Sequence, residues 1–119
     1  MEWQTRVKSI NELLTIVDQT SEMYSDPGEK RLALLHIFKQ VQVPLSLQLM
    51  DTRSVLTKQT ITALIHFAEN YPQEFGAFSG RYFKENDGLF KLLKNGKSLI
   101  SDMAHEGIQG IIGAVCIPK

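Results

Sequence analysis

Residues 61–68, Ile-Thr-Ala-Leu-Ile-His-Phe-Ala, carry the pattern that decides the fold. Ile61, Leu64, Ile65 and Ala68 occupy positions i, i+3, i+4 and i+7, which share one face of an α-helix. The pattern occurs twice more, starting 51 residues earlier and 47 residues later, as the quadruplets Ile10, Leu13, Leu14, Val17 and Ile108, Ile111, Ile112, Val115. The chain therefore contains an internal helical repeat.

The spacing of these quadruplets indicates an all-α solenoid. Two-helix units that recur about every 40–47 residues are typical of HEAT and armadillo repeats, in which each unit packs only on its neighbours. About three units are needed for stability, and 119 residues supply no more than that. We therefore expect one HEAT/armadillo-type α-solenoid domain over residues 1–119, with about five to six helices.

Composition limits the function classes. Thirteen Lys and Arg balance thirteen Asp and Glu, so no net positive charge favours a nucleic-acid partner. A single cysteine, Cys116, cannot form an internal disulfide, and Glu2, Arg6 and Lys8 interrupt the region where a signal peptide would be apolar. No apolar run approaches the roughly 18 residues of a membrane span. We expect a soluble protein of the reducing cytoplasm, without a membrane partner.

Caps and breakers predict the first two helices. The first is expected from about Gln4 to Asp18, with the polar stretch 19–25 ending it. Asp26 is a favourable N-cap for the second helix, with Pro27 at its first position and Glu29 where a capping box places an acid.

The second helix carries a proline in its interior. Its expected buried face consists of Leu32, Leu35, Phe38 and Val41. Pro44 removes one backbone hydrogen bond, so we expect a kink or a break near Val43. Leu45, Leu47 and Leu49 alternate with polar residues as in a strand, but a single strand would have no partner here, so we expect helix.

Three further helical regions follow. Asp51-Thr52 would cap a helix at about Arg53–Asn70, and Tyr71-Pro72 would end it. Glycines weaken the region 75–93, which favours two shorter helices over one. The last helix is expected at about Lys97–Val115. It contains Gly107, Gly110 and Gly113, each costing about 1 kcal/mol relative to Ala, and close approach of a neighbouring helix would explain them.

Antiparallel helix pairs would place the turns before the three quadruplet helices on one edge of the stack. These turns contain Trp3, Arg53 and Lys97, respectively. Trp and Arg are the residue types most enriched at binding hot spots. The alternative interpretation is that Trp3 packs on the first helix as a hydrophobic staple, and that the two cations are ordinary solvated charges.

No residue pattern indicates an enzyme. Residues 96–98, Gly-Lys-Ser, resemble the end of a phosphate-binding loop, but Lys91 occupies the position of the first glycine and a helix replaces the required strand. Asp102 and Glu106 flank His105 on one turn, which a solvated polar face explains because no nucleophile or apolar pocket accompanies them. Three histidines lie on different expected helices without metal-ligand spacing: His36, His66 and His105. We expect neither catalysis nor a metal or cofactor.

The turn sequences resemble the TOG domains of the cytoplasmic linker-associated proteins, the CLASP family. The resemblance rests on residues 2–7 (Glu-Trp-Gln-Thr-Arg-Val), 49–54 (Leu-Met-Asp-Thr-Arg-Ser) and 95–98 (Asn-Gly-Lys-Ser), which leads to 117–119 (Ile-Pro-Lys). It covers nearly the whole chain in order. Membership would imply a HEAT-repeat paddle whose intra-repeat turns bind tubulin, with a role in microtubule dynamics at the cytoplasmic cytoskeleton.

The resemblance also implies which residues bind tubulin. Trp3 matches the aromatic residue of the first turn, Arg53 and Ser54 match the second turn, and Asn95 and Lys97 match the third. Because tubulin's surface is acidic, the two cations would orient it while Trp3 fills an apolar hollow. The alternative function is a HEAT-repeat scaffold that holds another protein along a concave helix face, without tubulin affinity.

A complete TOG domain has more repeats than this chain supplies. The expected helices correspond to half of such a domain, so we expect a partial domain of a larger protein, either truncated or naturally divergent. An uncapped last helix would expose Ile112 and Val115, and we therefore expect self-association at that end.

Overall fold

The computed structural model of the chain describes residues 3–50, 54–83, 88–94 and 96–115. All regular structure in these ranges is helical, which confirms the all-α prediction. The elements in chain order are α1 (Trp3–Met23), α2 (Pro27–Leu49), α3 (Ser54–Asn70), α4 (Pro72–Gly76), the 3-10 helix η1 (Ser79–Phe83), α5 (Leu89–Leu93) and α6 (Ser98–Val115).

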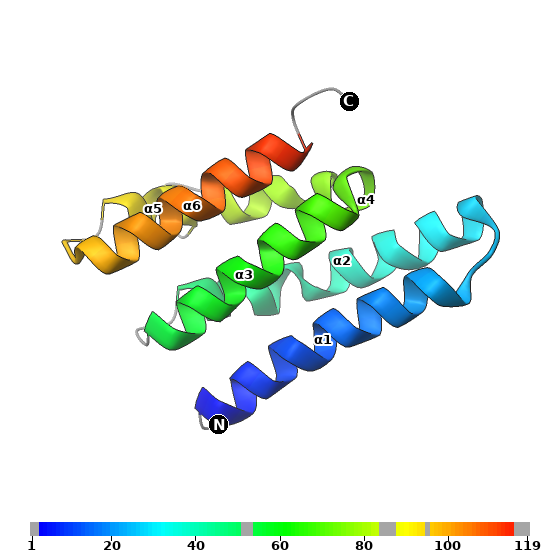
Figure 1. Cartoon of the computed structure of the whole chain (residues 1–119), viewed down its shortest axis with the longest axis horizontal. Coiled ribbons are helices and arrows are strands. Elements are labelled where there is room, and N and C mark those ends of the chain that lie inside the picture. Colours follow the sequence, from blue (N-terminus) through cyan, green and yellow to red (C-terminus); the bar gives the residue numbers. More distant parts are fainter. Residues whose placement is uncertain (1–2, 51–53, 84–87, 95, 116–119) are drawn as a thin grey trace.

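The helices form two layers, as Figure 1 shows. The long helices α1, α3 and α6 lie side by side and run in the same direction, with α2, α4 and α5 behind them. The central helix α3 packs against α1, α6, α2 and α4. The overall extents are 46 × 36 × 18 Å. Since packed helices lie about 8–10 Å apart, the shortest dimension accommodates two layers.

An aromatic cluster joins the two layers. Phe38 of α2 lies 5.2 Å from Phe67 of α3 and 5.4 Å from Phe75 of α4, measured between ring centroids, and Tyr82 of η1 stacks on Phe75 at 5.8 Å. All four side chains are 1% exposed or less. Aromatic pairs at these separations add to the stabilisation from burial alone, so this cluster is the centre of the core.

The repeated quadruplets form the core faces of α1 and α3, but only Ile111 of the third quadruplet belongs to the buried face of α6, which consists of Ile100, Met103, Ala104, Gly107 and Ile111. Ile10, Ile61 and Ile111 are each at most 4% exposed. The quadruplet in α6 is the least covered, because Ile112 is 40% exposed and Val115 is half-buried. The expectation that the last helix leaves apolar surface uncovered is therefore confirmed for Ile112.

The first helix is longer than predicted. It continues past Asp18 to Met23, so the expected end within residues 19–25 was placed too early. Thr20 donates its hydroxyl to the carbonyl of Ile16 at 2.8 Å, one turn back along the helix. Such local bonds satisfy polar side chains inside a helix, and a polar stretch therefore does not by itself end one.

The structure corrects two predictions about the interior of α2, one of them in part. Of the kink or break expected near Val43, the break does not occur, because the helix runs without interruption through Pro44 to Leu49. Pro44 lies on the exposed side, where water can hydrate the carbonyl that loses its partner. Leu32, expected in the core, is 69% exposed, and Leu34 is buried in its place. The helical assignment of the stretch around Leu47 and Leu49 is confirmed, as is the Asp26 cap, whose carboxylate accepts the Glu29 N–H at 2.9 Å.

The glycines of α6 divide into two kinds. A Cβ at Gly107 would lie 2.9 Å from Cγ2 of Ile61, and one at Gly110 would lie 3.1 Å from Cγ1 of Ile65. These two glycines allow α6 to approach α3 closely, as predicted. A Cβ at Gly113 would meet nothing within 4 Å, so the same explanation is wrong for Gly113.

Candidate functional site

The three quadruplet helices begin at the same edge of the molecule, on the left of Figure 1. This arrangement follows from antiparallel connections, because α2 returns the chain to the edge from which α1 departs. Residues 3–6 and 54–58, in the first turns of α1 and α3, and residues 96–99, which lead into α6, are termed the helix-start edge.

The predicted site residues lie at or next to this edge to the extent that the structure describes them. Trp3 and Ser54 are the first helical residues of α1 and α3, and their side chains lie outside the described part. Arg53 and Asn95 lie outside the described residues altogether. Lys97 is described, and it is exposed directly before α6.

The backbone of Lys97 starts α6. Its carbonyl accepts the N–H groups of Ile100 at 3.1 Å and of Ser101 at 3.2 Å. The helix therefore begins at Ser98, one residue later than predicted. This anchored carbonyl holds the Lys97 Cα at the helix-start edge while its side chain is exposed.

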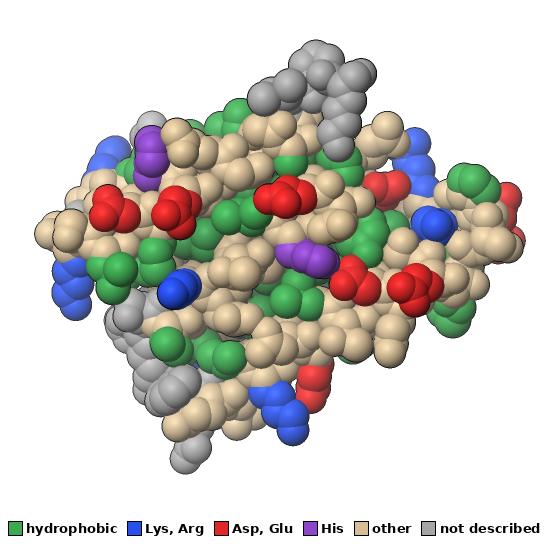
Figure 2. Space-filling model, viewed as in Figure 1, with side chains coloured by type: hydrophobic (Ala, Val, Ile, Leu, Met, Phe, Trp, Pro, Cys, Tyr) green, Lys and Arg blue, Asp and Glu red, His purple; other side chains and the backbone are tan. Residues whose placement is uncertain are grey.

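Exposed lysines lie at and near the helix-start edge, among them Lys97. The helix dipoles oppose one another here, because three long helices start at this edge while α2 ends at it. Lys58 in α3 and Lys94 after α5 are also exposed, and blue side chains project at this end of Figure 2. The exposed acids of α6, Asp102 and Glu106, lie one and two turns further along the helix. An acidic partner would therefore be favoured at the edge itself.

Two apolar residues of this edge were missed by the sequence analysis. Val55 is 46% exposed and Leu99 is 60% exposed, in the first turns of α3 and α6. Their exposure could have been predicted from their spacing. Val55 precedes Ile61 by six residues and Leu99 precedes Ile108 by nine, which places both away from the quadruplet face of the helix. The edge thus combines positive charge with exposed apolar surface.

A second polar cluster, also missed, joins α1 to α3 and the start of α4. The Asp18 carboxylate accepts a hydrogen bond from the Tyr71 hydroxyl at 2.6 Å and lies 3.2 Å from Nε2 of His66. The Asn70 amide donates to the carbonyl of His66 at 2.9 Å. Only the fold brings these groups together, because Asp18 and Tyr71 are 53 residues apart in sequence.

Mutual stabilisation explains the pKa shifts in this cluster. Burial raises the pKa of Asp18, but hydrogen bonds from Tyr71 and His66 outweigh it and hold the pKa below its usual 3.8. Burial, and then the Asp18 carboxylate, raise the pKa of Tyr71 to about 12. Ser21 of α1 also forms a side-chain hydrogen bond with Tyr71. All of these contacts tie α1 to the end of α3, so the cluster is best explained as a connection between helices.

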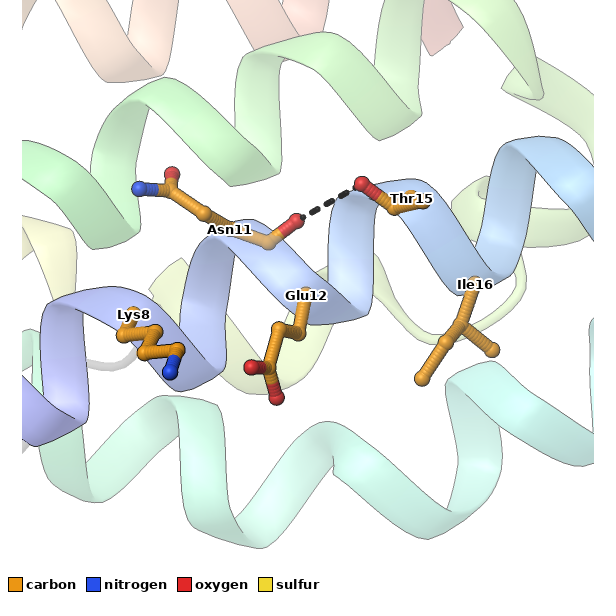
Figure 3. Close-up of a pocket in the computed structure, with 5 residues that line it drawn as sticks. All are labelled: Lys8, Asn11, Glu12, Thr15 and Ile16. Atoms are coloured by element: carbon orange, nitrogen blue, oxygen red, sulfur yellow. Dashed lines mark hydrogen bonds between the residues drawn. The ribbon is translucent and has the colours of Figure 1, made fainter.

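A shallow hollow on the outer side of α1 is not a binding site of its own. It is lined by one helix, through Lys8, Asn11, Glu12, Thr15 and Ile16. Figure 3 shows Lys8, Glu12 and Ile16 on the side of α1 away from α3. The Thr15 hydroxyl donates to the Asn11 carbonyl at 3.3 Å, and the Asn11 side chain accepts a hydrogen bond from Gln59. The side-chain oxygen of Asn11 and the hydroxyl of Thr15 therefore already form hydrogen bonds within the protein.

A larger groove lies between the second half of α1 and the first half of α2, with a volume of about 540 Å³. Its lining is mostly apolar, and Met23 and Leu32 are 71% and 69% exposed there. The complete lining is Thr20, Met23, Tyr24, Glu29, Leu32, Ala33, His36 and Ile37. A groove of this character suits a protein surface better than a small polar ligand.

The three histidines considered as metal ligands lie on different helices: His36 on α2, His66 on α3 and His105 on α6. Within the described ranges, no three His, Cys, Asp or Glu side chains are grouped so that they would hold a metal ion. Among the same residues, no helix combines the length and apolar character needed to cross a bilayer.

Comparisons with known proteins identify no relative. No protein-family model matches the chain, and neither the curated proteins nor the solved structures contain a match.

Proposed function

We propose that the chain is a HEAT-repeat, TOG-like module that binds tubulin through the helix-start edge and thereby regulates microtubule dynamics. The observation that carries the proposal is the shared starting edge of α1, α3 and α6. Each of the three segments that resemble TOG turns either begins or immediately precedes one of these helices.

The two-layer packing supports a solenoid of the HEAT type. Each quadruplet helix contacts the next one, and the second layer covers one side of all three. One departure from a simple repeat is the second layer between α3 and α6. There, α4, η1 and α5 take the place of a single helix, consistent with the helix-weakening glycines of this region.

The chemistry of the edge supports an acidic protein partner. Lys97 and Leu99 are both exposed at this edge, so a partner there would find both charge attraction and apolar surface to bury. Surface charges at distances beyond about 8–10 Å are screened at physiological salt, so binding through this edge should weaken as salt rises.

Direct binding to tubulin tests the proposal. Purified chain would be measured against free tubulin dimer and by cosedimentation with microtubules. The variants are Arg53→Glu and Lys97→Glu, and Arg31→Glu provides a matched charge reversal on exposed surface of α2. We expect each edge variant to weaken binding roughly tenfold, a typical order for losing a charged interface contact, while Arg31→Glu binds like the wild type. Absence of wild-type binding, or equal binding by all four proteins, would overturn the proposal.

A second candidate is a scaffold that holds another protein along a helix face without tubulin affinity. The α1–α2 groove favours it, because exposed Met23 and Leu32 lie far from the predicted tubulin-binding turns along α1 and α2. The same binding measurement separates the two functions, since this one predicts no wild-type affinity for tubulin in either assay.

A further inference from the structure

One end of the second layer carries cations and no described acid. It consists of the second half of α2, the helix η1, and α5 with the residue that follows it. These parts are contiguous, because η1 packs against both α2 and α5, and Nε of Arg81 donates to the Ser46 hydroxyl oxygen at 3.4 Å. The cations are Lys39, Arg81, Lys91 and Lys94. Residues 39–50, 79–83 and 88–94 contain no Asp or Glu.

Acids of the neighbouring segments do not balance these cations. Glu74 of α4 is half-buried, and Asp102 and Glu106 lie on the side of α6 opposite its buried face. Segments 51–53 and 84–87, outside the described residues, carry three acids and two cations in sequence. With these and Glu74 counted, the four cations still leave a net charge of +2, although the whole chain is neutral.

Large apolar side chains are exposed among the cations. Val43 and Leu47 are 50% and 68% exposed, and Phe90 is 37% exposed. Val43 follows Lys39 by one turn, and Lys94 follows Phe90 by one turn, so both helices carry a lysine beside an apolar side chain. The basic face is defined as Lys39, Val43, Leu47, Phe90, Lys91 and Lys94.

The basic face is directed away from the first layer. On α2, Phe38 packs against α3, and Leu47 lies nine residues later, about two and a half turns on and therefore on the opposite side. On α5, Leu89 packs against α6, and Lys91 and Lys94 are exposed on the other side. Both helices lie behind the first layer in Figure 1. The basic face therefore lies on one broad side of a molecule 18 Å thick.

We propose that the basic face binds the surface of an anionic lipid bilayer. Its three lysines contact anionic headgroups, and its three apolar side chains enter the boundary between headgroups and acyl chains. Such peripheral binding needs no membrane-spanning helix, so it differs from the expectation of no membrane partner, which rested on the lack of an apolar span. It is independent of the tubulin proposal, because Arg53 and Lys97 are not part of the basic face.

A bilayer accounts for both properties of the face. A nucleic acid would attract the lysines through its phosphates but would leave the aliphatic side chains of Val43 and Leu47 exposed. None of the six residues lines either of the two hollows described above, and a bilayer needs no hollow in the protein. Apolar side chains that project among lysines fit a partner that is anionic and penetrable.

Cosedimentation with vesicles tests the charge dependence. Each exposed lysine strengthens binding to an anionic surface about fivefold, so three predict about a hundredfold preference for phosphatidylcholine vesicles with about 30% phosphatidylserine over pure phosphatidylcholine. Lys91→Glu with Lys94→Glu should weaken binding about 25-fold or more. The matched control is Lys8→Glu with Lys58→Glu, exposed on the first-layer helices α1 and α3. It should weaken binding less than about threefold, because the 18 Å thickness exceeds the screening length.

Leu47→Gln tests the apolar contact. It should weaken vesicle binding about fivefold, whereas Met23→Gln, at an equally exposed apolar residue of α1, should not. Circular dichroism confirms the helical fold, and Val43→Gln replaces Leu47→Gln if that variant unfolds. The proposal is overturned by equal binding to the two kinds of vesicle, by equal losses from the two charge-reversal pairs, or by binding that Leu47→Gln leaves unchanged. Tighter binding to a DNA duplex at equal phosphate concentration would also overturn it, in favour of a nucleic-acid partner.

Discussion

Replacing Gly107 by Ala should destabilise the protein although alanine is the better helix former. In an open helix position, Gly→Ala gains about 1 kcal/mol. At Gly107 the added methyl would lie 2.9 Å from Cγ2 of Ile61 and 3.4 Å from a methyl of Leu89. Overpacking of this kind costs about 1–3 kcal/mol. The net effect is therefore a loss of about 1 kcal/mol, or roughly 4 °C in Tm for a chain of this size.

Gly113→Ala is the matched control within the same helix. No atom lies within 4 Å of its added Cβ, so it should gain about 0.5 kcal/mol, less than in mid-helix because α6 ends at Val115. Urea denaturation followed by circular dichroism measures both variants, and the expected result is opposite signs in one helix.

Changes at Ile61 test whether its Cγ2 causes the loss. Ile61→Ala removes that atom, so adding Gly107→Ala in this background should become stabilising. Ile61→Val retains both γ carbons, so Gly107→Ala should remain destabilising there. If Gly107→Ala stabilises the wild type as much as Gly113→Ala does, the close approach of α6 to α3 is not a packing constraint and the reasoning is refuted.

Three further changes test other contacts. Tyr71→Phe should cost about 1 kcal/mol in urea denaturation near pH 7. Because the pKa of Asp18 in the folded protein lies below its usual 3.8, its contribution to the unfolding free energy is present above pH 3.8 and is lost as the pH falls through the folded pKa. Tyr71→Phe should make the unfolding free energy fall less steeply in this acid range, and an unchanged dependence on pH would contradict the reasoning. Gln48→Met should raise stability by about 1 kcal/mol, because the Gln48 side-chain oxygen is buried without a hydrogen-bond partner in the described structure; a lower Tm would count against this. Asp26→Ala should lower the unfolding free energy by about 1 kcal/mol through loss of the Glu29 N–H bond, and unaltered urea unfolding would show that the cap is dispensable.

The periodic pattern predicted the long helices because it reflects burial directly. The quadruplets around Ile10 and Ile61 mark the core faces of α1 and α3, and the observed bounds of α3 and α6 differ from the expected ones by no more than a residue. The errors arose where two signals competed. In α2, Leu32 and Leu34 both belong to apolar lines, and the sequence alone does not say which line faces the core.

The candidate site was predictable only in part. The shared edge of Lys97 and the helix starts follows from alternating helix directions, and the off-face positions of Val55 and Leu99 could have been read from their spacing. The Asp18–Tyr71 hydrogen bond could not be predicted from the sequence, because it depends on how α1 packs against the end of α3.

Local patterns in the sequence were enough to predict that this chain is helical, which faces of α1, α3 and α6 are apolar, and where α2 begins, because periodicity and caps act within a few turns of one helix. Packing between helices settled which apolar line of α2 is buried and which glycines of α6 meet α3. Those outcomes depend on contacts between residues far apart in the chain. In α2, Leu32 could be distinguished from the core residue Leu34 only once the helix had packed against its neighbours.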